Sequence, residues 1–197
     1  MCIRDRLKQS GEFKNTYFLF TSDNGYMQGE HRLRSSKFLP YENSINVPAM
    51  MSGPGIRKNK SLNGAAIDVD LTATVLDMAG VKSGRKADGI SLLPAAKGKK
   101  KLPKRAQPLE AMRPLFKFYT PVTAFDLPYY GVRTDRYKYI HWSFNDENGA
   151  AEVELYDLKN DPDELNNIAK DPANAAIVAD LEAQASRLRT CAGAKCR

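Results

Sequence analysis

The chain changes character near its centre, and this change limits the folds open to it. Residues 82–108 combine glycines, prolines and a lysine cluster with little hydrophobic periodicity, a composition typical of a boundary. Short apolar runs and a helical pattern precede this stretch, whereas alternating bulky and polar residues follow it. A chain of 197 residues suffices for one large domain or two small ones. The sequence therefore predicts an α/β part over residues 15–96, a basic linker over 97–108 and an antiparallel subdomain over 109–197.

The first part carries the signals of two short strands and one helix. The segment "TYFLFTSDNG", from residue 16, is rich in aromatic residues and ends in a turn signal, and "INVPAMMSGPG", from residue 45, ends in a Gly-Pro-Gly turn. In "DVDLTATVLDMAGV" apolar residues recur near helical spacing, with Asp70 as the expected N-cap and Gly80 as the expected C′ residue. Strands that alternate with helices are typical of an α/β layer.

The second part of the chain has a different residue pattern. The segment "YYGVRTDRYKYIHW", residues 129–142, alternates bulky and polar residues, which predicts one long, half-buried antiparallel strand. A second strand follows in "EVELYDL". In "ANAAIVADLEAQASRLRT" four residues share one helical face: Ile177, Leu181, Ala185 and Leu188. The sequence therefore predicts a small antiparallel sheet with a terminal helix packed against it.

The formal net charge of +7 comes almost wholly from one short segment. Residues 97–105 hold six cations and no acidic residue: Lys97, Lys99, Lys100, Lys101, Lys104 and Arg105. Without these six, 24 basic residues remain against 23 acidic ones, so nucleic acid is not the expected partner. The segment is either a solvated linker or a patch that contacts a polyanion such as a sulfated glycan.

The cysteines give information about the cellular compartment of the protein. "CAGAKC" places four small or flexible residues between Cys191 and Cys196, a spacing that suits a local disulfide, with a metal pair or free thiols as the alternatives. A disulfide indicates an oxidising compartment, so we expect a periplasmic or secreted protein. No apolar run approaches the ~20 residues that span a bilayer. Residues 1–14 carry no periodic pattern and no signal-peptide core, and we expect them to be a non-native leader.

Two oxygen-bearing side chains follow the first expected strand. Asp23 and Asn24 lie where ligands gather in open α/β sheets, at the carboxyl end of a strand. Their oxygens suit Ca²⁺ or Mg²⁺ rather than zinc, and Gly25 lets the backbone turn away without crowding an ion. Asp-Asn-Gly is also a common turn, and Ca²⁺ takes six to eight oxygens. The remaining ligands of such a site must come from elsewhere.

The surrounding motifs resemble those of the sulfatase family, the calcium-dependent, formylglycine-type members of the alkaline-phosphatase superfamily. The resemblance rests on "TSDNG", "GEH" at 29–31, Lys37, "PYE" at 40–42 and "VPAMMSGPG" at 47–55, in the order of the family pattern. It continues through "DGISLLP", "YYGVRTDRYKYI" and "ELYDLKNDPDELNNIA". The chain thus resembles the C-terminal portion of a sulfatase: the end of the mixed-sheet α/β domain, then the antiparallel subdomain.

The resemblance implies roles for four side chains. Asp23 and Asn24 would be two of the Ca²⁺ ligands, and Lys37 would bind a sulfate oxygen of a sulfated sugar or aryl sulfate. A cation there offsets the charge that builds as the S–O bond breaks, although a solvated surface charge is the ordinary fate of a lysine. His31 either contacts the substrate or stays neutral and hydrogen-bonded beneath the site. Arg133 and Lys138, on the predicted long strand, have expected structural roles.

The nucleophile of such an enzyme is absent from this chain. Sulfatases make formylglycine from the Cys or Ser of a C/S-x-P-x-R motif. The segment from Cys2 to Arg6 lacks the proline, and the segment from Ser52 ends in Ile56 instead of arginine. We therefore expect the formylglycine and a signal peptide in a missing N-terminal part, and we predict that the 197-residue chain has no sulfatase turnover alone.

Two other functions compete with this reading. A phosphate or phosphonate ester hydrolase of the same superfamily shares much of the scaffold, but zinc enzymes favour His where this chain has Asn24. A non-catalytic module that holds polyanions through the cations of residues 97–105 is the second alternative.

Overall fold

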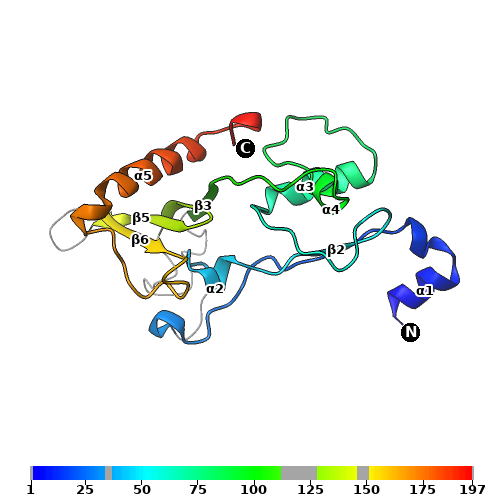
Figure 1. The fold of residues 1–197 in the computed structure, drawn as a ribbon, viewed down its shortest axis with the longest axis horizontal. Coiled ribbons are helices and arrows are strands. Elements are labelled where there is room, and N and C mark those ends of the chain that lie inside the picture. The colour runs from blue at the N-terminus through cyan, green and yellow to red at the C-terminus, as the bar shows by residue number, and fades with distance from the viewer. Residues whose placement is uncertain (1, 34–36, 112–127, 146–150, 197) are drawn as a thin grey trace, which may run out of the picture.

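The computed structural model describes residues 2–33, 37–111, 128–145 and 151–196. Figure 1 shows three regions along the molecule: an antiparallel sheet covered by α5 at one end, α3 and α4 in the middle, and α1 at the other end. No helix in these described ranges has the length and apolarity that crossing a bilayer requires.

The structure confirms the predicted antiparallel sheet and corrects one of its strands. Its order is β3-β4-β5-β6, and every neighbouring pair is antiparallel. The four strands are β3 (Gln107–Ala111), β4 (Tyr129–Arg133), β5 (Tyr137–Asn145) and β6 (Ala151–Asp157). The prediction of one strand over residues 129–142 is wrong, because the chain turns between β4 and β5. The Thr134 hydroxyl accepts the Tyr137 N–H at 2.9 Å, and the Thr134 N–H donates to the Tyr137 carbonyl at 2.8 Å.

Both faces of this sheet are buried, so the expectation of a half-buried strand is also wrong. Side chains alternate along a strand, and each face meets a different neighbour. One face carries Val132, Tyr139 and Leu155 against α5 (Ala175–Arg189). The opposite face packs on the segment that contains the candidate site, and its cluster is Met27, Leu39, Tyr41, Tyr129, Ile140, Trp142 and Tyr156.

The terminal helix packs as the sequence predicts. A short 3₁₀ helix, η4 (Pro172–Asn174), leads into α5. On α5, Leu181, Ala185 and Leu188 are buried against the sheet, and Ile177 packs partly buried beside them. The four residues recur at i, i+4, i+8 and i+11, which places them on one face.

The first part holds a two-stranded sheet. β1 (Phe18–Phe20) pairs antiparallel with β2 (Met50–Ser52), which confirms both short strands. Phe20 and Met50 lie opposite each other in the register and expose 61% and 58% of their surface. Ahead of β1 come α1 (Ile3–Gln9), which has no buried residue, and the 3₁₀ helix η1 (Glu12–Asn15). The sequence pattern gave no signal for α1.

Helix α3 (Val69–Met78) begins at a different cap from the predicted one. The Asp68 side chain accepts the Val69 N–H at 2.8 Å, so Asp68 is the N-cap. Asp70 is instead fully buried and accepts the N–H groups of Ile67 at 3.1 Å and Ile90 at 2.8 Å.

The buried Asp70 forms an ion pair with Arg105, whose side chain is only 6% exposed. Arg105 therefore does not belong to the exposed basic patch in which the sequence placed it. A burial of this kind requires a paired carboxylate. The pair ties the segment before β3 to α3, close to α4 (Leu93–Ala96).

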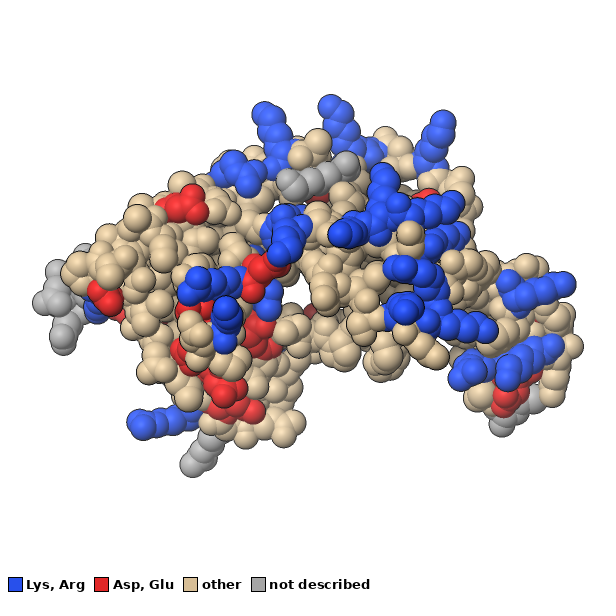
Figure 2. Space-filling view, viewed as in Figure 1, with Lys and Arg blue, Asp and Glu red and all other residues tan. Residues whose placement is uncertain are grey.

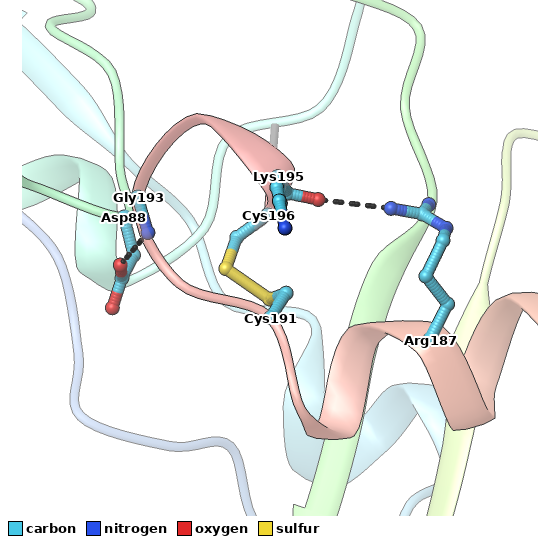
Figure 3. The surroundings of a disulfide bond; sticks show 6 residues. All are labelled: Asp88, Arg187, Cys191, Gly193, Lys195 and Cys196. Carbon is cyan, nitrogen blue, oxygen red and sulfur yellow. Dashed lines mark hydrogen bonds between the residues drawn. A yellow bond between two sulfur atoms is a disulfide. The ribbon is translucent and has the colours of Figure 1, made fainter.

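The C-terminal tail contains the predicted disulfide. Cys191 and Cys196 are bonded across the 3₁₀ helix η5 (Gly193–Cys196). Figure 3 shows how the loop is attached: the Gly193 N–H donates to the Asp88 carboxylate at 2.6 Å, and the Arg187 guanidinium donates to the Lys195 carbonyl at 2.9 Å. The closed loop thereby joins the end of α5 to the segment that follows α3.

Removing the disulfide should lower stability modestly. For the Cys191→Ser/Cys196→Ser double variant we expect a loss on the order of 2 kcal/mol in the free energy of unfolding, because the closed loop is short. Urea denaturation with and without dithiothreitol measures it. Reductant should destabilise the wild type by the same amount and leave the double variant unchanged, with Cys2→Ser as the control. An unchanged wild type under reductant would contradict the prediction.

Candidate functional site

The loop after β1 presents the two predicted metal ligands. Asp23 is exposed, and its carboxylate lies 3.4 Å from the Ser22 hydroxyl, which donates its shorter hydrogen bond to the Asn24 carbonyl at 2.7 Å. The Asn24 side-chain nitrogen donates to the Gly25 carbonyl at 2.7 Å. Within the described residues, no donor contacts the remaining oxygen, Asn24 Oδ1. The loop thus offers a carboxylate and an amide oxygen to a ligand.

Gly25 fixes this loop against α2 (Glu42–Ile45). Its N–H donates to the Ser44 carbonyl at 2.8 Å. A Cβ atom at this position would lie 2.0 Å from the Asn43 carbonyl oxygen, so only glycine allows the two backbones to approach this closely. The sequence explained Gly25 by space for an ion, whereas the structure shows a backbone contact with α2.

A buried ion network holds α2 to the antiparallel sheet. The Glu42 carboxylate accepts two hydrogen bonds from the Arg133 guanidinium, at 2.8 and 3.0 Å. Lys138 Nζ lies 2.8 Å from Glu42 and 2.5 Å from Glu164. Glu164 also accepts the backbone N–H of Glu42 at 2.6 Å. The side chains of Lys138 and Glu164 are fully buried, which confirms the structural roles expected for Arg133 and Lys138.

The pKa values of the two carboxyl groups in this network shift in opposite directions. Burial raises the pKa of Glu42, but the hydrogen bonds from Arg133 and the charge of Lys138 outweigh it and bring the pKa down to about 2. Burial raises the pKa of Glu164, and the facing Lys138 offsets only part of that effect. Glu42 therefore carries the stable negative charge of the network.

His31 has a strained backbone and a nitrogen without a partner. It lies in the 3₁₀ helix η2 (Glu30–Arg32), where His31 has φ 52° and Arg32 has φ 60°, a region that is unfavourable for side-chain-bearing residues. The His31 ring stacks on Tyr41, with centroids 3.9 Å apart. Its Nε2 atom is buried and has no hydrogen-bond partner among the described residues. An orphaned buried nitrogen is typical of a group that meets a ligand.

Neighbouring Glu30 bonds to the backbone of its own loop. Its carboxylate accepts the Gln28 N–H at 2.5 Å, and no ion pair joins it to Arg32 within the described part of the chain.

Tyr41 carries the stacked histidine and is itself anchored in the sheet. Its hydroxyl lies 3.3 Å from the Glu154 carboxylate, which also accepts the Trp142 indole N–H at 3.0 Å and the Tyr156 hydroxyl at 2.9 Å. Burial raises the pKa of Glu154 despite these three donors. The adjacent residues Tyr41 and Glu42 therefore both attach the candidate site to the antiparallel sheet.

Lys37 is exposed, and its ammonium group lies 5.8 Å from the ring centroid of Phe38. In the described ranges, no hydrogen bond, ion pair or ring contact joins Asp23 or Asn24 to His31 or Lys37. Nor do the described residues contain a group of three His, Cys, Asp or Glu side chains placed to hold a metal. Asp23 and Asn24 fit two oxygen ligands of a calcium site, and the other ligands must come from beyond these residues.

Comparison with known proteins identifies the family of this chain. The family profile described as "N-sulphoglucosamine sulphohydrolase, C-terminal" matches residues 29–191. The chain belongs to the sulfatase family and corresponds to the C-terminal region of its relatives.

Individual relatives agree with this assignment. N-acetylglucosamine-6-sulfatase of Bos taurus is 33% identical over 98% of this chain, which spans 38% of that protein. Among solved structures, BT4656 in complex with its substrate D-glucosamine-2-N,6-O-disulfate has a TM-score of 0.80 and 29% identity over 95% of this chain and 36% of its own. A phosphonate monoester hydrolase of Agrobacterium radiobacter has a TM-score of 0.75 and 25% identity over 95% of this chain and 37% of its own.

The ion network gives a pH dependence that can be measured. The pKa of folded Glu42 lies below the ordinary value of 4.5, at about 2, so its contribution to stability is present above pH 4.5 and is lost as the pH falls towards 2. Between these pH values we expect the wild type to lose about 3 kcal/mol more of its unfolding free energy than Glu42→Gln.

Urea denaturation at a series of pH values measures this difference. Glu154 titrates in both proteins and does not contact Glu42, so its opposite contribution cancels in the comparison. The exposed Glu12 supplies the control variant Glu12→Gln, which should follow the wild-type curve. If the unfolding free energies of the wild type and Glu42→Gln changed equally with pH, the proposed contribution of Glu42 to stability would be wrong.

Proposed function

We propose that this chain forms one part of a calcium-dependent, formylglycine-type sulfatase that hydrolyses the sulfate ester of a sulfated sugar. The observation that carries the proposal is the loop held on α2, which offers the Asp23 carboxylate and the Asn24 amide oxygen in a chain of the sulfatase family. The names of two similar proteins, which include glucosamine derivatives, support a sugar substrate.

Each candidate residue has a role in this proposal. Asp23 and Asn24 would hold the calcium ion, which when bound supplies positive charge to the sulfate oxygens. The exposed ammonium group of Lys37 would bind a sulfate oxygen and stabilise the charge that builds on it during S–O cleavage. His31 would contact the substrate through Nε2, a buried atom that has no partner in the part of the chain that the structure describes.

The remaining parts of the site would come from the rest of a longer protein. The chain spans 38% of the length of the bovine relative, and it contains no C/S-x-P-x-R motif. Phe20 and Met50 expose more than half of their surface on the sheet of β1 and β2, as strands of a larger sheet would without their neighbours. We propose that residues 15–96 complete the catalytic α/β domain and that residues 109–197 form the C-terminal subdomain.

We further propose that the parent protein is periplasmic or secreted. The bonded pair Cys191–Cys196 supports this location, because structural disulfides persist in oxidising compartments.

Hydrolysis of phosphonate esters is the second candidate function. The structural likeness to a phosphonate monoester hydrolase favours it, and that likeness extends over the same part of the chain as the likeness to BT4656. The two candidates differ in the reacting ester and share the metal loop, so substrate assays are needed to separate them.

Loss of Lys37 should impair catalysis in the full-length protein. Lys37→Ala should lower kcat/KM for a glucosamine 6-sulfate substrate by roughly 100- to 1000-fold, because a group that stabilises transition-state charge is removed. Lys37→Arg should recover part of the rate. The exposed Lys159 supplies the control Lys159→Ala, which should match the wild type. Equal rates for Lys37→Ala and the control would contradict the role of Lys37.

The 197-residue chain should have no turnover, whereas the full-length protein should prefer a sulfate ester to the matching phosphonate ester. Initial rates with 4-nitrophenyl sulfate, glucosamine 6-sulfate and a phenylphosphonate ester measure both statements. Hydrolysis of a sulfate ester by the isolated chain would contradict the first. A higher kcat/KM for the phosphonate would replace the proposed function with the second candidate.

A further inference from the structure

Two segments that are distant in the sequence form one basic surface over α4 and the loop after β2. We use "basic surface" for these seven residues: Arg57, Lys58, Lys60, Lys97, Lys99, Lys100 and Lys101. Figure 2 shows lysine and arginine side chains gathered over this middle region, with few acidic side chains among them. The sequence pattern singled out only the second segment.

Backbone contacts hold the two segments together. The Arg57 N–H donates to the Ala96 carbonyl at 3.1 Å, and the Ala65 N–H donates to the Pro103 carbonyl at 2.9 Å. Between these bonds the guanidinium of Arg57 packs on Gly98, where an added Cβ would lie 2.6 Å from the Arg57 Nε atom. The lysine run therefore has a fixed place beside residues 57–60.

The lysine run also continues directly from the last turn of α4. The Lys97 N–H donates to the Leu93 carbonyl at 2.9 Å, and the Lys99 N–H donates to the Pro94 carbonyl at 2.8 Å. The Lys97 ammonium lies 5.5 Å from the ring centroid of Tyr17. Beyond it, Lys99, Lys100 and Lys101 are exposed to solvent. This arrangement presents several ammonium groups from a short, hydrogen-bonded backbone.

The charge of the basic surface is not neutralised locally. Across the described residues, no carboxylate lies within 4.0 Å of its seven cations. The two other cations of the run are paired elsewhere, Lys104 with Asp135 at 3.3 Å and Arg105 with Asp70. Clustered cations without nearby acids produce a positive field that attracts polyanions.

We propose that the basic surface binds a sulfated glycan chain outside the candidate catalytic site. Six of its seven cations are lysines, whose compact ammonium charges suit sulfate oxygens and lack the planar fork with which arginine reads bases. The Lys97 ammonium lies over the Tyr17 ring, where it competes with the base stacking that single-stranded nucleic acid requires. The choice of a sulfated partner rests on the proposed function, because a sugar substrate within a longer chain brings further sulfates.

Binding to a fluorescent heparin octasaccharide tests this proposal on the 197-residue chain. Fluorescence anisotropy is measured in EDTA at low ionic strength, so the result does not depend on a metal at Asp23 and Asn24. Two triple variants remove the two halves of the surface: Arg57→Gln/Lys58→Gln/Lys60→Gln and Lys99→Gln/Lys100→Gln/Lys101→Gln. Each should raise the Kd by roughly 100-fold, and added salt should weaken wild-type binding steeply.

A matched control removes the same charge elsewhere. Lys8, Lys159 and Lys195 are exposed and lie outside the basic surface, so Lys8→Gln/Lys159→Gln/Lys195→Gln should change the Kd by less than about threefold. In the full-length protein both triple variants of the basic surface should leave kcat/KM for the monosaccharide glucosamine 6-sulfate unchanged, which separates this proposal from the proposed function. The proposal would be overturned if the control triple variant weakened heparin binding as much as the two surface variants do. It would also be overturned if the wild type bound hyaluronan or single-stranded DNA as tightly as heparin.

Discussion

The buried contact of Lys138 with Glu42 and Glu164 is the interaction on which the rest of the molecule depends. It joins three segments that are far apart in the sequence, and it does so where the side chains of Lys138 and Glu164 have no access to water. A lysine buried in this way is tolerated only because carboxylates face it. Since Glu42 begins α2, the network sets where α2 lies against the sheet.

The position of α2 then determines the position of the candidate site. Gly25 binds the backbone of α2 directly, so the loop of Asp23 and Asn24 follows it. Tyr41 precedes the same helix, stacks on His31 and reaches Glu154 on β6. The antiparallel subdomain therefore has two faces with two tasks: α5 stabilises one, and the other supports residues of the proposed metal and substrate site.

The sequence predicted the local elements well and the long-range pairings poorly. β1, β2, β6 and α5 follow patterns of a few neighbouring residues, so their prediction succeeded. The turn at Thr134 was not predicted, because it contains neither Gly nor Pro and depends on a side-chain hydrogen bond. Asp70 was read as a cap because its partner Arg105 lies 35 residues away. Similarly, nothing in the sequence placed Arg57 beside the lysine run. Asp23 and Asn24 were found from their place at the end of a strand, whereas Lys37 and His31 were found from resemblance alone, and their metal and substrate roles stay proposals.

The central claim is that this chain belongs to a larger sulfatase whose nucleophile lies outside it, and the DNA upstream of Met1 tests that claim most directly. Sequencing this DNA in the source sample should show a continuous reading frame that encodes a C/S-x-P-x-R motif and an early pair of aspartates, followed by the present chain. A stop codon directly upstream, with transcripts that begin at Met1, would contradict the account. Asp23, Asn24 and Lys37 would then have no nucleophile to serve.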